Sequence, residues 1–168
     1  MNAPNRILVA GIGNIFLGDD AFGVEVVHKL IGSDLPEGVD VVDFGIRGYD
    51  LAYAIMDGYA ATILVDTVSK GNPPGTLYVI EPDTEELAKL QKELPNGHNL
   101  GPVHVLHLVQ SLGGQIAGLY LVGCEPAVLE SEDGQMGLSE PVQAAVPQAV
   151  EMIRRLVNDL NVKASSLR

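Results

Sequence analysis

The chain has 168 residues, of which 46% are hydrophobic and 19% are charged, and its formal net charge is −12. This balance is typical of one globular domain, which we expect to span residues 1–168 with a core from about 6 to 158. The acidic charge, without any run rich in Lys or Arg, argues against nucleic acid and anionic membranes as partners.

Membrane, export and disulfide signals are not found either. No apolar run approaches the roughly 20 residues of a membrane-spanning helix, and residues 1–6 lack the pattern of a signal peptide. The single cysteine cannot form an internal disulfide, which fits a reducing compartment. We therefore expect a cytoplasmic protein, and we expect it to be a monomer.

Apolar runs alternate with helical periodicity along the chain, which is the pattern of an α/β domain. The expected strands are 7–10, 39–44, 62–65, 76–80 and 116–122, and the expected helices are 20–31, about 49–56, 83–92, 103–112 and 139 to about 157. Only a short turn at 71–75 precedes the fourth strand, so we expect that strand to be antiparallel and at an edge. The sum is a three-layer αβα fold: a mostly parallel twisted sheet of about five strands with one antiparallel edge strand and helices on both faces.

Local signals refine three of these elements. The first strand is apolar on both faces, so it is expected to be central. Asp19 is the expected N-cap of the first helix, and Gly32 its end. Pro147 lies inside the last helix and predicts a kink or a late start, since an interior proline costs about 3 kcal/mol, and a frayed tail is expected from about Asn158.

The most informative stretch is the glycine-rich turn at 11–23, GIGNIFLGDDAFG, between the first strand and the first helix. Such turns often hold a phosphate at the positive end of a helix. This turn instead carries Asp19 and Asp20, which repel a phosphate and attract a cation. Its Gly13–Gly18 spacing is that of a P-loop, but aspartates replace the Lys and the Ser or Thr, and a dinucleotide motif would need its third glycine elsewhere. We interpret the turn as metal-facing and keep nucleotide binding as a weaker alternative.

Asp20, Asp66 and His98 are candidate site residues, each with a simpler explanation. Asp20 could merely stabilise a helix start, by roughly 0.3–1 kcal/mol. Asp66 ends the third strand and could merely hydrogen-bond the next turn, and His98 could be a solvated loop side chain. Asp20 follows the first strand, however, and ligands gather at the carboxyl edge of such sheets, where the strand order reverses. Topology alone could therefore bring Asp20 and Asp66 together.

Other residues with reactive side chains have structural interpretations. His104 and His107 lie three residues apart and could bind a metal, but we favour the polar edge of a helix. His28 is expected on the surface. Cys124 follows the last strand with Glu125 beside it, and we expect a small buried thiol rather than a nucleophile.

With these residues in view, the chain resembles the [NiFe]-hydrogenase maturation endopeptidases from Ile7 to about Val157. The resemblance rests on the glycine-rich turn, ILVDTV at 63–68, PPGT at 73–76, His98 ahead of GPVHVL at 101–106, and LVGCEP at 121–126. Two departures, Ala21 for glycine and Cys124 for an aliphatic residue, do not affect the family's metal-contacting triad. By motif position that triad corresponds to Asp20, Asp66 and His98, which the resemblance marks as both catalytic and metal-binding.

The resemblance implies an endopeptidase that removes the C-terminal extension of a [NiFe]-hydrogenase large-subunit precursor after nickel insertion. Two carboxylates and one imidazole suit a borderline divalent ion, and three ligands leave room for water or substrate. The nickel would arrive inside the substrate, and zinc or cadmium could substitute. Two mechanisms remain open: metal activation of water, or recognition by the metal with Asp20 or Asp66 as general base. A non-enzymatic nickel-binding maturation chaperone is the alternative.

Overall fold

The structure is a computed structural model that describes residues 6–82, 102–129 and 137–166. All five expected strands are present, and they form one sheet in the order β2-β1-β3-β5-β4. The parallel strands are β1 (Ile7–Ile12), β2 (Val39–Gly45), β3 (Ala61–Thr67) and β5 (Leu119–Cys124). The edge strand β4 (Leu77–Ile80) pairs antiparallel with β5, as the short preceding turn predicts.

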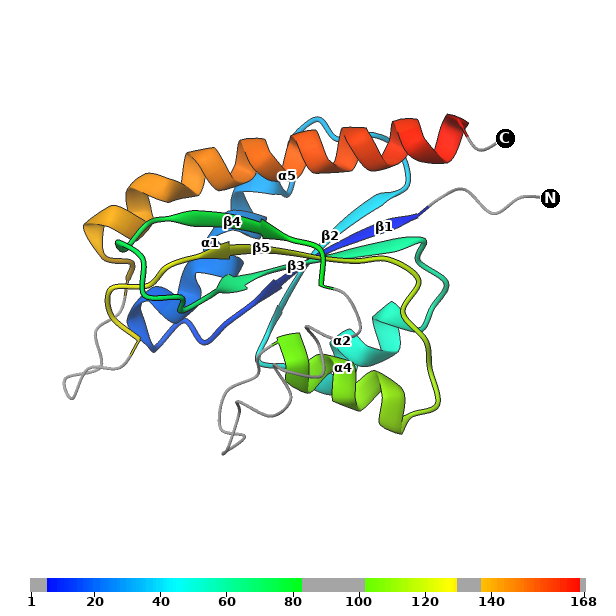
Figure 1. Cartoon of the computed structure of the whole chain (residues 1–168), viewed down its shortest axis with the longest axis horizontal. Coiled ribbons are helices and arrows are strands. Elements are labelled where there is room, and N and C mark those ends of the chain that lie inside the picture. Colours follow the sequence, from blue (N-terminus) through cyan, green and yellow to red (C-terminus); the bar gives the residue numbers. More distant parts are fainter. Residues whose placement is uncertain (1–5, 83–101, 130–136, 167–168) are drawn as a thin grey trace.

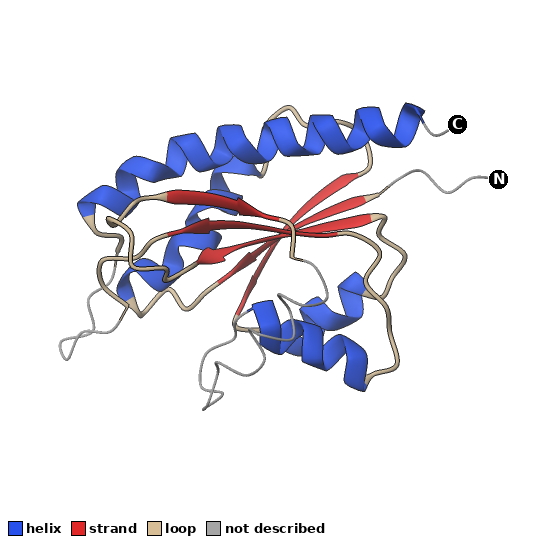
Figure 2. Cartoon of the chain, in the orientation of Figure 1, coloured by secondary structure: helices blue, strands red, loops and turns tan. Residues whose placement is uncertain are grey.

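Two pairs of helices sandwich this sheet and give the expected three layers. One face carries α1 (Phe22–Leu30) and α5 (Glu140–Ser166), and the other carries α2 (Gly48–Ile55) and α4 (Pro102–Ser111) (Figure 1 and Figure 2). The expected helix at 83–92 and the loop with His98 lie outside the described residues. Among the helices of the described ranges, none combines the length and hydropathy that crossing a membrane requires.

The alternation of side chains along β1 explains why both faces are covered. Successive strand residues point to opposite sides of a sheet. Ile7 and Val9 join the hydrophobic core under α1 and α5, whereas Leu8 and Ala10 join the second core under α2 and α4. β1 lies between β2 and β3, so the prediction of an inner strand is confirmed, although the strand continues to Ile12.

Two expected element boundaries are wrong by more than two residues. The last strand begins at Leu119 rather than residue 116, because Leu119 pairs with Thr62 near the start of β3 and earlier residues have no strand partner there. The last helix extends to Ser166, so the frayed tail from about Asn158 is also wrong. Val157 is fully buried and Leu160 packs against the same core, so the apolar stripe of the helix continues past residue 157.

Pro147 does not delay the start of α5, which begins at Glu140 and continues through the proline. Pro147 lies on the solvent face of the helix. A proline there removes the N–H that would pair with the carbonyl four residues earlier, at Gln143, whose side chain is also exposed. Water can satisfy that carbonyl, which is why the interruption is tolerated.

The strand order places a switch point beside β1. The chain runs from β1 to β2 on one side of β1, and then crosses back to form β3 on the other side. In open sheets of this kind, the carboxyl ends of the two strands at the reversal form a ligand-binding crevice. Here those ends lead into the glycine-rich turn after β1 and into Asp66 of β3.

Candidate functional site

The glycine-rich turn folds tightly over the ends of β1 and β3. A Cβ atom on Gly23 would lie 2.0 Å from the carbonyl oxygen of Val65 and 2.4 Å from that of Ile12, so only glycine lets α1 start so close to both strands. Gly13 has φ +146°, and a Cβ there would lie 1.8 Å from the carbonyl oxygen of Asp20. The glycines therefore hold the turn with Asp20 above the end of β1.

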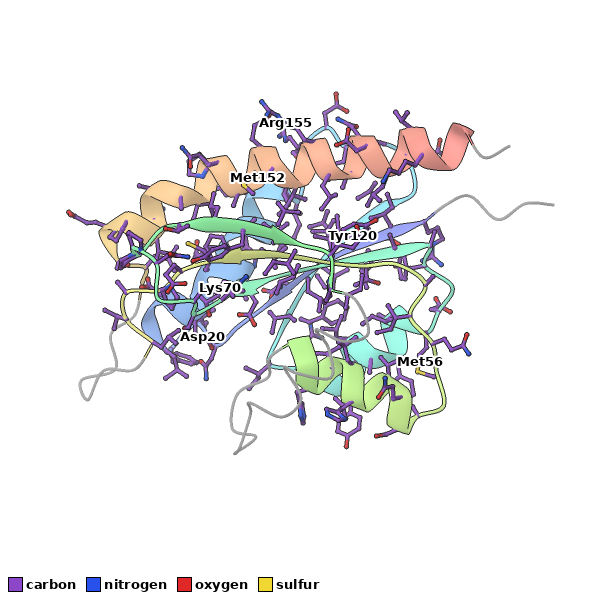
Figure 3. The ribbon with its side chains drawn as sticks, in the orientation of Figure 1. Asp20, Met56, Lys70, Tyr120, Met152 and Arg155 are labelled. Carbon is purple, nitrogen blue, oxygen red and sulfur yellow. The ribbon has the colours of Figure 1, made fainter. Side chains whose placement is uncertain are left out.

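Asp20 and Asp66 converge at this edge of the sheet. Asp20 lies in the 3-10 helix η1 (Gly18–Ala21) and is half-buried, at the end of the sheet to which the β3 and β5 arrowheads point (Figure 3). Asp66 is 5% exposed on β3, the strand next to β1. Burial first, and then the charge of Asp20, raise the pKa of Asp66 well above its usual value. The two carboxylates are therefore close enough to act on each other.

Both carboxylates receive few hydrogen bonds from the described residues. The N–H of Asn14 donates to Asp20 Oδ2 at 2.8 Å, and the N–H of Thr67 donates to Asp66 Oδ1 at 2.8 Å. Burial raises the pKa of Asp20 as well, and its one backbone donor only partly opposes that effect. Within the described ranges this pair therefore has few donors to offset its charge, which is the electrostatic condition that attracts a cation or a proton.

Asp19, one residue earlier, has the opposite environment. It is fully buried, and its carboxylate accepts hydrogen bonds from the N–H groups of Ala127, Val128 and Ser139 and from the Ser139 hydroxyl, at 2.7–2.8 Å. Burial alone would raise its pKa, but these donors outweigh burial and lower it. The N-cap prediction is wrong, because the side chain makes no cap hydrogen bond to α1 and instead joins distant loops.

Glu125 is a second buried carboxylate of this kind, and its role was not predicted from the sequence. It is 4% exposed, and the N–H groups of Lys70, Gly71 and Asn72 and the Tyr78 hydroxyl donate to it at 2.7–3.1 Å. These donors outweigh the effect of burial and lower its pKa. In the sequence, Glu125 follows the last strand and precedes a proline, and this position indicates that it lies at the edge of the sheet.

Hydrogen-bond supply thus separates the acidic residues of this edge into two groups. Asp19 and Glu125 are saturated with donors and hold loops in place, as structural carboxylates do. Asp20 and Asp66 each accept one hydrogen bond from the part of the chain that the structure describes, as groups reserved for a ligand or for proton transfer do. No cluster of three or more metal-ligating residues occurs within the described ranges, and His98 lies outside them. The structure therefore brings together two of the three predicted site residues and leaves the third as a prediction.

The remaining reactive residues of the described ranges are either buried in the core or exposed on the surface. Cys124 is fully buried in the core, and burial together with the charges of Asp19 and Glu125 raises its pKa to about 11, so the prediction of a buried thiol is confirmed. His104 and His107 are both exposed on α4. His28 is on the surface, where its Nε2 lies 2.8 Å from Asp43 Oδ2.

Comparisons with known proteins agree on one family. A family model described as hydrogenase maturation protease matches residues 24–156. The hydrogenase 2 maturation protease of Escherichia coli is 34% identical over 160 residues, covering 95% of this chain and 94% of that protein.

Solved structures extend this agreement to the fold. The hydrogenase maturating endopeptidase HybD from E. coli superposes with a TM-score of 0.76 at 35% identity, over 92% of this chain and 93% of that one. A hydrogenase 2 maturation peptidase from a Thaumarchaeota archaeon superposes with a TM-score of 0.68 at 33% identity, over 91% and 98% of the two chains.

Proposed function

The chain belongs to the hydrogenase maturation protease family and is a peptidase, and from this premise we propose that it trims the C-terminal extension of a [NiFe]-hydrogenase large-subunit precursor. In this proposal the cut follows nickel insertion, and the nickel arrives as part of the substrate. Asp20, Asp66 and His98 contact that nickel and place the scissile peptide bond beside them. The reaction takes place in the cytoplasm.

The observation that carries the proposal is the donor-poor pair of Asp20 and Asp66 at the switch point of the sheet. Each accepts one hydrogen bond from the described residues, and burial raises the pKa of both. A divalent ion would give these oxygens a positive partner. Two carboxylate oxygens with the imidazole of His98 make a mixed donor set that suits nickel, and zinc or cadmium would also fit it.

The same pair can carry the proton in peptide hydrolysis. A carboxylate within hydrogen-bond reach of a water molecule can act as its general base. Asp66 or Asp20 would take a proton from a water molecule as its oxygen bonds to the peptide carbonyl carbon, and would pass that proton to the departing amine as the C–N bond breaks. The bound nickel supplies either Lewis-acid activation of that water or only an anchor for the substrate.

The direct test is incubation of the purified protein with nickel-loaded precursor, followed by intact-mass measurement. Loss of mass equal to a C-terminal peptide is expected for wild type, and Asp20→Asn, Asp66→Asn and His98→Ala should each abolish it while remaining folded. Nickel-free precursor should stay uncut, and Cys124→Ala should cut normally. Metal transfer without cleavage would instead identify a nickel chaperone, and an inactive but folded Cys124→Ala would indicate a thiol protease.

A further inference from the structure

We propose that Asp19 is a positioning residue for the site: its carboxylate fixes the turn that carries Asp20 to the loop after β5 and to the start of α5. Only the activity readout of this inference rests on the proposed function. The inference itself rests on contacts among described residues.

One carboxylate joins three segments that are distant in sequence. Oδ2 of Asp19 accepts the N–H groups of Ala127 and Val128, both at 2.8 Å, and the Ser139 hydroxyl at 2.8 Å. Oδ1 accepts the N–H of Ser139 at 2.7 Å. The backbone adds a reciprocal bond, because the N–H of Asp19 donates to the carbonyl of Val128 at 2.8 Å. The residue is therefore bonded to the β5–α5 connection through both its side chain and its backbone. We call this set of hydrogen bonds the clamp.

The turn has little conformational freedom just before Asp19 and Asp20. Gly18 has φ +54°, and a Cβ there would lie 2.9 Å from the carbonyl oxygen of Val128, so the turn is pressed against the loop after β5. Asp19 follows Gly18 directly, and Asp20 follows Asp19. The carboxylate of Asp20 accepts a hydrogen bond from the N–H of Asn14. Because Asp19 directly precedes Asp20 in the chain, release of the Asp19 carboxylate shifts Asp20 relative to Asp66 on strand β3.

The clamp requires a carboxylate rather than any side chain of that size. All of the donors around Asp19 are N–H or O–H groups, and they approach both oxygens. An asparagine keeps one acceptor oxygen and turns an NH₂ group toward at least one of these donors. The substitution Asp19→Asn therefore keeps the volume of the side chain and breaks the clamp on one side.

The experiment compares three variants that are each first shown to be folded by circular dichroism. Asp19→Asn breaks the clamp, Ser139→Ala removes one donor and provides a milder form, and Ile153→Ala is the control. Ile153 is fully buried in the core on the same helix, α5, and is not among the partners of Asp19. The control lowers stability without touching the turn, so it separates positioning from general weakening of the fold.

Two readouts are measured at a temperature where all variants are folded. The first is the kcat for cleavage of nickel-loaded precursor, which should fall by about 10- to 100-fold in Asp19→Asn, the usual size of effect for residues that orient metal ligands. The second is hydrogen exchange of the Asn14 amide, which binds Asp20 and should exchange faster in Asp19→Asn. Ser139→Ala should change both in the same direction by less, and Ile153→Ala should change neither.

Equal losses in Asp19→Asn and Ile153→Ala would overturn the inference, because they would show only a loss of stability. Unchanged kcat and unchanged Asn14 exchange in a folded Asp19→Asn would overturn it as well. Should Asp19→Asn fail to fold, Ser139→Ala takes its place, and its kcat and Asn14 exchange are compared with those of Ile153→Ala. If wild type itself cuts no precursor, the proposed function fails, and the Asn14 exchange alone decides the role of Asp19.

Discussion

Asp66→Asn should make the protein more stable at neutral pH while it abolishes cleavage. Asp66 is 5% exposed, and burial and the Asp20 charge both disfavour its ionised form. Asparagine is nearly the same size and removes the charge. Its side-chain oxygen can still accept the hydrogen bond from the N–H of Thr67. The variant therefore loses an unfavourable charge and keeps the partner that the described residues provide.

The size of the gain follows from what a buried polar group costs when its partners are missing. That penalty is about 1–3 kcal/mol and is larger for charged groups. Part of the gain is offset because the new NH₂ group also needs an acceptor. We expect a net gain of about 1–2 kcal/mol in the free energy of unfolding at pH 8, or roughly 2–4 °C in Tm per kcal/mol.

The pH dependence of this gain has a definite sign. Because the folded-state pKa of Asp66 is raised, the folded protein binds more protons than the unfolded chain between about pH 4 and that raised pKa. Stability of the wild type therefore falls as the pH rises through this window. Asp66→Asn has no such group, so its advantage should be largest at pH 8 and should disappear near pH 4.

The assay is urea unfolding of metal-free protein at several pH values, with Glu125→Gln as the control. Glu125 has a lowered pKa because donors surround it, so its contribution is present above its usual pKa of about 4.3 and is lost as the pH falls further. Glu125→Gln should therefore be destabilised at pH 8, opposite to Asp66→Asn. If Asp66→Asn were destabilised like the control, or if its gain did not depend on pH, the division of these carboxylates into two groups would be wrong.

Two further predictions concern the ion and the thiol. Zn²⁺ or Cd²⁺ at a hundred times its Kd should raise the unfolding free energy of wild type by about 2.7 kcal/mol and leave that of Asp66→Asn and Asp20→Asn unchanged. Thermal unfolding with and without EDTA measures this difference. An equal rise in all three proteins would place the ion elsewhere. Cys124 is fully buried with a pKa of about 11, so it should react with a thiol reagent such as Ellman's reagent only when the protein unfolds. Rapid reaction of the native protein would contradict that assignment.

The layers and the strand pairing were predictable because they depend on patterns that act locally. The runs of apolar residues in β1 and β3 indicate strands covered on both faces, and the short turn before β4 permits only an antiparallel neighbour. The ends of elements were less predictable. Leu119 starts β5 because Thr62 offers it a partner, and α5 continues past residue 157 because Leu160 still packs against the core. Neither cause is visible within a short window of sequence.

The site was predictable in part, for a similar reason. Asp20 and Asp66 could be placed at one edge from topology, since each follows or ends a strand on either side of the switch point. The role of Asp19 could not be predicted, because its donors come from residues 127, 128 and 139, more than a hundred positions away. A helix start offers a common explanation for an aspartate there, and only the tertiary contacts show that this explanation is wrong.

These two kinds of carboxylate suggest why the site would respond to a nickel-loaded substrate. The fold has backbone donors available at this edge and directs them to Asp19 and Glu125, while Asp20 and Asp66 each receive one from the described residues. Among the described residues this leaves an electrostatic deficit at Asp20 and Asp66 that a cation would correct and that a metal-free peptide would not. Under the proposed function, the nickel-loaded precursor would bind more tightly than the empty one, because part of its binding energy comes from the ion. The protein would therefore select the loaded precursor. The same deficit predicts that variants which remove it gain stability as they lose activity, which is why the sign of the Asp66→Asn effect tests the mechanism as well as the structure.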